Sequence, residues 1–473
     1  MRVQVSPPAP YAYIIFVMSR GCGSVIRMTT SAALGAYLLC LFGMALFFSR
    51  RESLDTYFLN KRKTSLWLMT FSTVATVVGA GGSVAIVAEV QRTGISYGLA
   101  LPISFVAGMI ILGCVASKIR SIGEQYGATT IVDFFGKKYD RKTKLLTGIL
   151  QIFLLIIWIA IQAIAMASVA SVLTGFEYHI ALTLAAIVTI LYTAIGGLKI
   201  DILTDFVQFW IILFFFLWMA VAGYQNVGGF AQLFHALPAG HLNPFAFGGV
   251  SWFTGVIVLS GFIFLGNTTY WQRILSAENE RVARQSFFLA IPFVFVLGII
   301  ILFLGLVAST VIPVANDDTA VFALMSVLLR PWMLGIGLAA MLAVIMSSVD
   351  SLLVGGSAIL YGALFGDKQE TKNRVLYARF LTALFGACGF FLALFVPEIV
   401  SLSLVVTYLS LIFVPASFAA IYHKNVSANA AFWSLLVPSG VLFLCFPFVK
   451  ENTFIITTSL SVVILTMYDR ISH

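Results

Sequence analysis

The chain contains few charged residues. Asp, Glu, Lys and Arg make up 10% of its 473 residues, whereas a soluble domain carries roughly 25%. Hydrophobic residues make up 60%, and the mean hydropathy is +1.01. This amount of charge cannot cover the water-exposed surface of a chain this long, so the composition excludes a soluble globular protein and predicts a polytopic membrane protein.

Cysteine and histidine are also scarce, with five of each. The cysteines show no CxxC spacing and the histidines fall in expected loops or at the C-terminus, so the sequence predicts no zinc or haem site. It contains no Ser/His/Asp or HExxH arrangement and no phosphate-binding lysine motif. We therefore expect neither an enzyme nor an ATP-driven pump.

Long apolar runs fill most of the chain. Each run has at least roughly 17 residues, the length that a helix needs to cross a bilayer, and helices satisfy their own backbone groups in lipid. We therefore predict an all-α integral membrane protein with about thirteen transmembrane helices, at 30–49, 65–91, 97–117, 146–174, 178–196, 201–224, 249–270, 286–313, 331–365, 377–395, 399–421, 429–448 and 453–468.

Lysine and arginine are unevenly distributed between the two sets of loops. Most of the 28 fall on one side, and the positive-inside rule makes that side cytoplasmic. This predicts a multi-pass protein of the inner, or cytoplasmic, membrane with its N-terminus outside and its C-terminus inside. Basic residues beside a bilayer do not indicate nucleic acid as a partner. The cytoplasmic set includes Lys61, Arg62, Lys63, Lys118, Arg120, Lys137, Lys138, Lys144, Lys199, Arg273 and Arg284.

Residues 1–28 do not fit this pattern. Three prolines, Pro7, Pro8 and Pro10, precede an apolar run that is too short to span a bilayer and lacks a cleavage site. We expect residues 1–28 to be an N-terminal extension, with Met28 as the working start, and residues 29–473 to form a single transmembrane domain.

Two of the predicted spans carry breaks at mid-depth. The span at 65–91 contains Ala75-Thr76-Val77-Val78-Gly79-Ala80-Gly81-Gly82-Ser83, and the span at 249–270 contains a second glycine-bearing stretch from Ser260 to Thr269. Each glycine costs up to ~1 kcal/mol in a helix, and unwound backbone at membrane depth is tolerated only where it lines an enclosed cavity. Each broken span is also the first of five, which is typical of an inverted-repeat transporter with repeats at about 65–224 and 249–421. Close packing of small residues is the alternative interpretation of Gly79 to Gly82.

The span at 331–365 adds hydroxyl groups and an acid in Met346-Ser347-Ser348-Val349-Asp350-Ser351. Serines in membrane helices often donate to the preceding turn, which is one interpretation of Ser347 and Ser348. The other is that their hydroxyls and the carbonyl of Val344 are oxygen ligands. Carbonyls freed at Ala75 and Val78 would complete a neutral oxygen shell, which suits an alkali cation better than Zn²⁺.

Two acids lie within predicted spans. Asp205 and Asp350 are functional candidates because an unpaired charge in a membrane is costly. Asp205 lies near the cytoplasmic end of its span, where it could attract a cation that leaves inward. It could instead cap the start of its helix or contact Lys199. Either acid could also carry a proton.

Several stretches of the chain resemble the bacterial sodium/solute symporters. Gly196-Gly197-Leu198-Lys199 with Thr204-Asp205 and Gln208 is similar to the GGL(K)…TDxxQ signature of that family, and Met346 to Ser351 is similar to its MSTxDS motif. The resemblance extends to its YFLAGR, glycine-rich and QRxLAA…AR segments, which match Tyr57 to Arg62, Gly79 to Gly82 and Gln272 to Arg284.

The resemblance implies a LeuT-like core of two inverted five-helix repeats and transport by alternating access. It implies that Na⁺ is the coupling ion and binds at the oxygens of Ala75, Val78, Val344, Ser347 and Ser348. Asp205 matches the residue that receives the cation on its way inward. The solute is expected against the two breaks, at Gly79, Gly81, Gly82, Ser260, Ile263 and Phe264.

The chain departs from the family where particular substrates are bound. Gly82 and Ile263 replace the Gln and Tyr of sugar carriers, and Val77 replaces an acid of proline carriers. Tyr270-Trp271-Gln272-Arg273 is similar to carriers of urea or related amides. We therefore expect a sodium-coupled symporter that imports a small polar solute, an amino acid, a carboxylate or a urea-like amide, without an obligate protein partner. A proton-coupled symporter of the same fold and a membrane sensor are the alternatives.

Overall fold

The computed structural model describes residues 23–49, 53–314, 320–366, 373–395, 399–423, 425–449 and 453–472. Over these ranges the chain is helical, without a named β-strand, as predicted. Residues 1–22 of the predicted N-terminal extension lie outside them, and residues 23–28 form the start of helix α2 (Gly23–Phe48).

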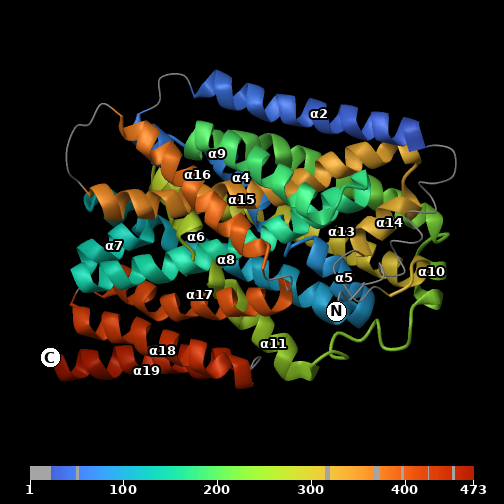
Figure 1. Ribbon diagram of the computed structural model, residues 1–473. Helices are drawn as coiled ribbons and strands as arrows, with labels where there is room; N and C mark the ends of the chain where they lie inside the picture. The colour runs from blue at the N-terminus through green and yellow to red at the C-terminus, as the bar shows by residue number, and fades with distance from the viewer. Residues whose placement is uncertain are drawn as a thin grey trace, which may run out of the picture.

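The helices lie side by side in one bundle (Figure 1). Helix α2 runs along one edge of it, and α18 (Ala428–Val449) and α19 (Thr453–Ser472) run along the opposite edge. Between them lie α6 (Ile95–Gln125), α8 (Arg141–Thr174), α9 (Tyr178–Asn226), α13 (Glu280–Val311), α15 (Leu334–Phe365), α16 (Arg374–Ala393) and α17 (Ile399–Tyr422).

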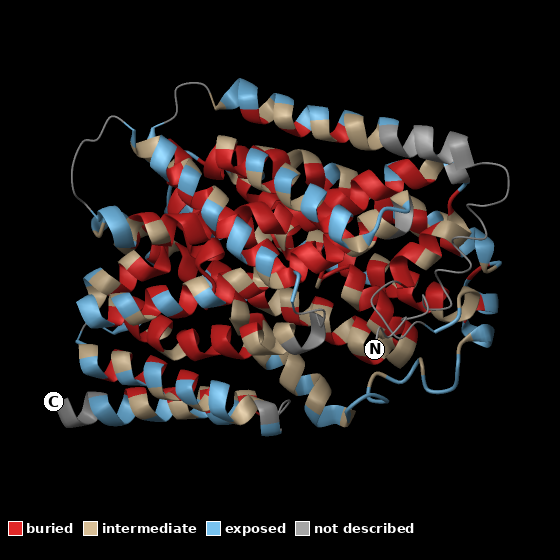
Figure 2. Ribbon diagram, in the orientation of Figure 1, coloured by how far each residue is buried: buried red, intermediate tan, exposed pale blue. Residues whose placement is uncertain are grey.

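Helix α15 is the central element of the bundle. In its most apolar stretch of 18 residues, 89% is buried inside the protein. The buried share of the corresponding stretch is 39% in α16 and 39% in α18. Figure 2 shows the same gradient, with buried residues in the middle and exposed residues along α2 and α19. Because α15 packs against α2, α4, α8, α9 and α16, a polar side chain on any of its faces lies inside protein.

Among the described residues, eight helices are long and apolar enough to cross a membrane, and the bent pair α11 (Gly249–Ser260) and α12 (Thr268–Ser276) makes a ninth candidate. Shorter apolar helices, such as α4 (Leu66–Val78), come in addition. The count of about thirteen spans stays a prediction.

Helix α9 combines two of the predicted spans, 178–196 and 201–224, in one element. The chain turns at Gly197, whose φ of 57° and ψ of −163° define a backbone conformation that residues with a side chain rarely adopt. A Cβ at Gly197 would also lie 2.6 Å from the carbonyl oxygen of Tyr57. The glycine therefore lets the two halves of α9 meet at an angle while Tyr57 packs into the bend.

The basic segments gather at one end of the bundle, which we call the basic end. Arg62 donates hydrogen bonds to the carbonyls of Leu275 and Ala128, and Lys138, the last residue of α7 (Ile131–Lys138), donates to the carbonyl of His423. Burial lowers the pKa of Arg62, and neighbouring Arg120 adds to that shift.

The short elements α3 (Leu54–Leu59), η1 (Asn60–Arg62), α5 (Val84–Thr93), α10 (Phe230–Ala236), η2 (Gly261–Phe264), α14 (Ala320–Leu328) and η3 (Pro331–Met333) complete the described fold.

Candidate functional site

The first break separates α4, which ends at Val78, from α5, which starts at Val84. The last four carbonyls of a helix have no partner within the helix. Two of these carbonyls are reached from α15: the Ser347 hydroxyl lies 3.0 Å from the carbonyl oxygen of Ala75, and the Ser348 hydroxyl lies 2.9 Å from that of Thr76. The two predicted serines and the break are therefore in direct contact.

The hydroxyl of Ser347 contacts more acceptors than it can satisfy. It also lies 2.9 Å from the carbonyl oxygen of Val344, in the preceding turn of α15. A hydroxyl has one hydrogen, so it can donate to only one of the two carbonyls. Three oxygen atoms thus converge with only one hydrogen among them. Such a set of oxygen ligands fits a monovalent cation.

The five predicted cation ligands are not all linked by contacts of this kind. Ala75, Val344 and Ser347 converge, and Ser348 adjoins them through Thr76. The carbonyl of Val78 faces Gly82 across the break, 2.8 Å from where a Cβ of Gly82 would lie. That these oxygens bind Na⁺ stays a prediction.

A cavity of about 110 Å³ lies between the two breaks. Helix α6 contributes Phe105, and α8 contributes Trp158 and Gln162. The predicted residues Gly79, Gly81, Gly82, Ile263 and Phe264 line it, whereas Ser260, at the end of α11, does not. The cavity wall is aromatic on several sides, and its polar groups are neutral amides and hydroxyls, among them those of Gln162, Asn267, Thr269, Ser348 and Ser410.

The second break runs from the end of α11 through η2 to α12, and the two helices are bent by 54°. Asn267 caps α12, because its side-chain oxygen accepts from the backbone N–H of Thr269 at 3.0 Å. Gly266 lies against the carbonyl of Ser410 in α17 and leaves no room for a side chain. The glycine is therefore required by close approach of two backbones.

At each break, a glutamine of α8 forms hydrogen bonds with the backbone groups that the break leaves without helical partners. Gln162 accepts a hydrogen bond from the backbone N–H of Ala80 at 3.1 Å. Gln151 donates to the carbonyl of Gly266 at 2.6 Å and accepts from the N–H of Thr268 at 3.2 Å. Unwound backbone inside a membrane protein needs such partners because unpaired groups there are costly.

Beside the break in α4 lies a buried network around Arg273. Its Nη2 is 3.0 Å from Oδ2 of Asp205 and 3.9 Å from Oδ2 of Asp201, and Arg273 is 1% exposed. The same nitrogen donates to the hydroxyls of Thr76 and Ser351, and Ser351 donates to Asp201. One guanidinium therefore connects α4, α9, α12 and α15.

This network corrects the sequence-based placement of Arg273 in a loop and identifies the charged partner of Asp205. Arg273, counted with the cytoplasmic loops, is buried within α12, because the chain resumes a helix directly after the break instead of leaving the bundle. Asp205 contacts Arg273, whereas Lys199 donates to the carbonyl of Phe48. Contact with Lys199 was therefore the wrong alternative.

The network and the predicted cation ligands share Thr76. Its carbonyl accepts from Ser348, and its hydroxyl lies 3.3 Å from the carbonyl oxygen of Ser347 and accepts from Arg273. Asp205 has one carboxylate oxygen, Oδ1, without a hydrogen-bond partner among the described residues. Two carboxylates and one guanidinium leave one negative charge in excess if both acids are ionised.

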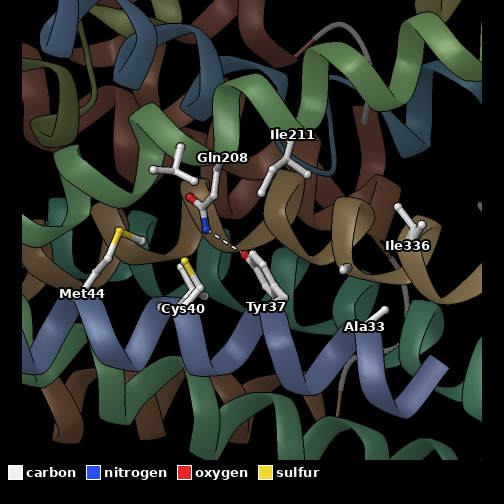
Figure 3. Close-up of a pocket in the computed structure, with 10 residues that line it drawn as sticks. Ala33, Tyr37, Cys40, Met44, Gln208, Ile211 and Ile336 are labelled. Carbon is white, nitrogen blue, oxygen red and sulfur yellow. Dashed lines mark hydrogen bonds between the residues drawn. The ribbon is translucent and has the colours of Figure 1, made fainter. Parts of the chain in front are cut away.

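A second cavity, of about 330 Å³, lies between α2, α9 and α15 (Figure 3). Ala33, Cys40, Met44, Ile211 and Ile336 are among its lining residues, which are almost all apolar. Its polar groups are Tyr37 and Gln208, joined by a hydrogen bond from Gln208 Nε2 to the Tyr37 hydroxyl at 2.8 Å. As lined by the described residues, this cavity lacks the convergent polar groups that a polar solute requires.

Solved transporter structures share this fold. The chain aligns with a Na⁺-coupled sialic acid symporter, in a substrate-bound outward-open state, with a TM-score of 0.81 at 16% identity over 94% of this chain and 98% of that one. It aligns with Mhp1, a nucleobase-cation-symport-1 family transporter, with a TM-score of 0.60 at 12% identity over 88% and 94%. The predicted LeuT-like fold is thus confirmed.

The sequence comparisons identify the family. The chain belongs to the sodium:solute symporter family, whose sequence model matches residues 57–438. It is 26% identical to a sodium/pantothenate symporter of Haemophilus influenzae over 77% of this chain and 79% of that protein. It is 26% identical to the osmoregulated proline transporter OpuE of Bacillus subtilis over 73% and 74%. The family and these relatives are transporters and not enzymes, as predicted.

Proposed function

We propose that this protein is a symporter that couples the import of a small polar organic solute to the entry of Na⁺. The observation that carries the proposal is the Ser347 hydroxyl, which lies between the carbonyls of Ala75 and Val344 with one hydrogen for both. A cation bound at this point would be coordinated by the Ser347 hydroxyl and by the two carbonyl oxygens. The coupling ion would be held by Ala75, Val78, Val344, Ser347 and Ser348.

The cavity between the breaks supports a small solute. Its volume of about 110 Å³ favours a small amino acid or a short carboxylate over a sugar. This agrees with the absence at Gly82 and Ile263 of the Gln and Tyr that sugar carriers have.

The charge distribution favours a solute with a carboxylate over a urea-like amide. Among the described residues, no charged side chain lines the cavity, and Gly81 and Gly82 bring it to the N-terminus of α5. Helix N-termini carry unpaired N–H groups and partial positive charge, which attract anions. Na⁺ beside the carboxylate would add a full positive charge.

Ser348 couples the two ligands in this scheme, because it lines the cavity and is one of the proposed Na⁺ ligands. Bound Na⁺ would hold α15 against the broken α4 and stabilise the shape of the cavity that accepts solute, which is a shift in population. A membrane potential adds about 2.3 kcal/mol per charge per 100 mV to the driving force.

Asp205 is the proposed receiver of Na⁺ on its way to the cytoplasm. Its Oδ1 has no hydrogen-bond partner in the part of the chain that the structure describes, and Thr76 contacts both Asp205 and the proposed ion ligand Ser348. Release at this side requires that the basic end face the cytoplasm, with the N-terminus outside and the C-terminus inside the inner membrane. We further propose that residues 65–224 and 249–421 are the two inverted repeats.

Uptake into proteoliposomes tests the proposal. Purified protein receives an inward gradient of Na⁺, and matched vesicles receive an equal gradient of K⁺. The solutes are proline, pantothenate, acetate, urea and glucose. We expect Na⁺ to stimulate uptake of at least one small carboxylate and not of glucose. Equal uptake with Na⁺ and K⁺ for every accumulated solute would refute sodium coupling.

A further inference from the structure

Gln208 belongs to the same sequence motif as Asp205, but the proposed sodium and solute sites do not use it. It lies one turn after Asp205 on α9 and is 0% exposed. Its side chain lines the apolar cavity between α2, α9 and α15 (Figure 3). A buried amide in such a place needs hydrogen-bond partners, because an unpaired polar group in apolar surroundings is costly.

The amide of Gln208 has one position for a hydrogen bond that the described residues do not fill. Its Nε2 donates to the hydroxyl of Tyr37 at 2.8 Å, and its Oε1 has no partner among the described residues. Figure 3 shows these two side chains pointing toward one another from α9 and α2. None of the other described residues that line the cavity has a side-chain oxygen or nitrogen. The cavity therefore presents one open polar position in an apolar wall.

A hydroxyl group fits this position in either orientation of the amide. The oxygen and nitrogen of a glutamine amide exchange places when the amide turns by half a rotation. With the oxygen open, the position accepts a hydrogen bond, and with the nitrogen open, it donates one. A hydroxyl can do both, whereas a carbonyl only accepts and an ammonium group only donates. The matching ligand group is thus an alcohol.

The space around this position suits an apolar chain. A second cavity, of about 440 Å³, adjoins the first, because Val207, Ile211 and Ile336 line both. Aromatic side chains of α9 line the second cavity as far as Trp218. Trp218 lies ten residues after Gln208 in α9, which is about 15 Å along the helix. A molecule with its hydroxyl at Gln208 therefore has room for an apolar chain of about this length.

The cavity opens on a side of the bundle that faces hydrocarbon. Two of its lining residues are exposed at the surface, Cys40 and Ile336, the latter to 43%. Other exposed side chains of α2, such as those of Leu39 and Phe47, are also apolar, and α2 runs along one edge of the bundle (Figure 1). An apolar helix of this length lies in the hydrocarbon of a bilayer. Molecules dissolved in the bilayer can therefore reach the cavity.

We propose that this cavity binds an apolar alcohol dissolved in the bilayer, with its hydroxyl on Gln208 and its chain along α9. The described lining carries no charge to attract an ion; Asp350 of α15 contacts the hydroxyl of Thr193 at 2.7 Å and does not line the cavity. Water fits less well, because a buried water needs roughly two to four polar partners. The inference depends neither on sodium binding nor on the identity of the solute.

Photolabelling of the purified protein in lipid vesicles tests the proposal. The probes are a straight-chain alcohol that carries a diazirine and the matched alkane without the hydroxyl, and mass spectrometry locates the labelled residues. We expect the alcohol to label the cavity lining, including Tyr37 and Met44. Gln208→Leu should reduce this labelling about fivefold, because one hydrogen bond is lost. The alkane should label both proteins weakly and to the same extent.

Two results would overturn the proposal. One is equal labelling of the wild type and Gln208→Leu by the alcohol. The other is equal labelling of the wild type by the alcohol and the alkane. Either would mean that the cavity takes up apolar chains without recognising a hydroxyl.

A second pair of variants keeps the test decisive if Gln208→Leu does not fold. Ala33→Phe fills the cavity from α2 and retains Gln208, whereas Ala36→Phe changes an exposed position of the same helix that does not line the cavity. We expect the alcohol to lose its labelling of the cavity in Ala33→Phe and to retain it in Ala36→Phe. Labelling at the wild-type level in Ala33→Phe would place the alcohol elsewhere and refute the site. Sodium-driven uptake, measured on the same preparations, reports separately on the proposed function.

Discussion

The hydroxyl oxygen of Ser347 lies 3.0 Å from the carbonyl oxygen of Ala75, across the interface between an intact helix and a broken one. The two residues are 272 positions apart in the chain. Their contact has two causes. Helix α4 ends at Val78, so its last carbonyls have no partner within the helix, and Ser347 of α15 lies beside that end. The break in the helix therefore creates the candidate cation site.

The serine pair gives the first prediction. Ser347→Ala combined with Ser348→Ala removes both hydroxyls from the proposed shell. The apparent affinity for Na⁺ should fall at least about tenfold, which corresponds to about 1.4 kcal/mol. The Na⁺ dependence of uptake in proteoliposomes measures it. Ser357→Ala, on the same helix but bonded to Val354 and Thr382, is the control. An unchanged Na⁺ dependence in the double variant would exclude these ligands.

The Arg273 network gives the second prediction, a contrast between two charge changes. Arg273→Met leaves Asp201 and Asp205 without a cation, and breaking a buried ion pair costs about 3–5 kcal/mol. Asp205→Asn leaves one acid for one arginine, so its stability should change much less. Thermal melting in detergent compares the two variants. Equal losses would show that the network is not balanced by charge.

Transport should separate Asp205 from the solute site, which is the third prediction. Because Asp205 lies beyond Thr76 from the cavity, Asp205→Asn should lower the rate of turnover by about tenfold or more (about 1.4 kcal/mol or more) and leave solute binding nearly unchanged. Uptake kinetics and equilibrium solute binding measure the two effects. Wild-type kinetics in Asp205→Asn would argue against a role in cation release.

Two neighbouring glycines of the first break give the fourth prediction. A Cβ at Gly82 would lie 2.6 Å from the carbonyl oxygen of Val77, whereas a Cβ at Gly81 meets no atom within 4 Å. Gly82→Ala should therefore destabilise the protein by about 1–3 kcal/mol. Gly81→Ala should keep its stability and lower solute affinity, because its methyl group enters the cavity. Similar melting temperatures for the two variants would contradict this geometry.

The glutamines of α8 give the fifth prediction. Gln151→Leu leaves the carbonyl of Gly266 and the N–H of Thr268 unpaired, which should cost about 1–3 kcal/mol. Gln225→Leu, at an exposed position of α9, is the matched control and should change stability by less than about 0.5 kcal/mol. Thermal melting distinguishes them. Equal stabilities would mean that Gln151 does not support the break.

Sequence reasoning located both breaks, because clustered glycines weaken a helix wherever it lies. It also placed Gly79, Gly82 and Phe264 near one another, where they line one cavity. What it could not provide was the other wall of that cavity. Trp158 and Gln162 belong to an unbroken apolar span without a motif, and only the packing of α8 against the breaks brings them there.

Arg273 was misplaced for a related reason. A charge a few residues after a break is usually a loop residue, and its assignment to the cytoplasmic loops followed the positive-inside rule. In the fold, α12 continues into the bundle, where Asp201 and Asp205 compensate the charge. An arginine in a helix directly after a break, with acids on another span, was the available signal. Asp201 was overlooked because its neighbour in sequence, Asp205, carried the motif.

Direct binding of radiolabelled Na⁺ to the purified protein tests the central claim most closely. The account predicts saturable Na⁺ binding in the wild type, an increase in its dissociation constant of at least about tenfold in Ser347→Ala, and unchanged binding in Ser357→Ala. Wild-type Na⁺ binding in Ser347→Ala, or no saturable Na⁺ binding in the wild type, would contradict it.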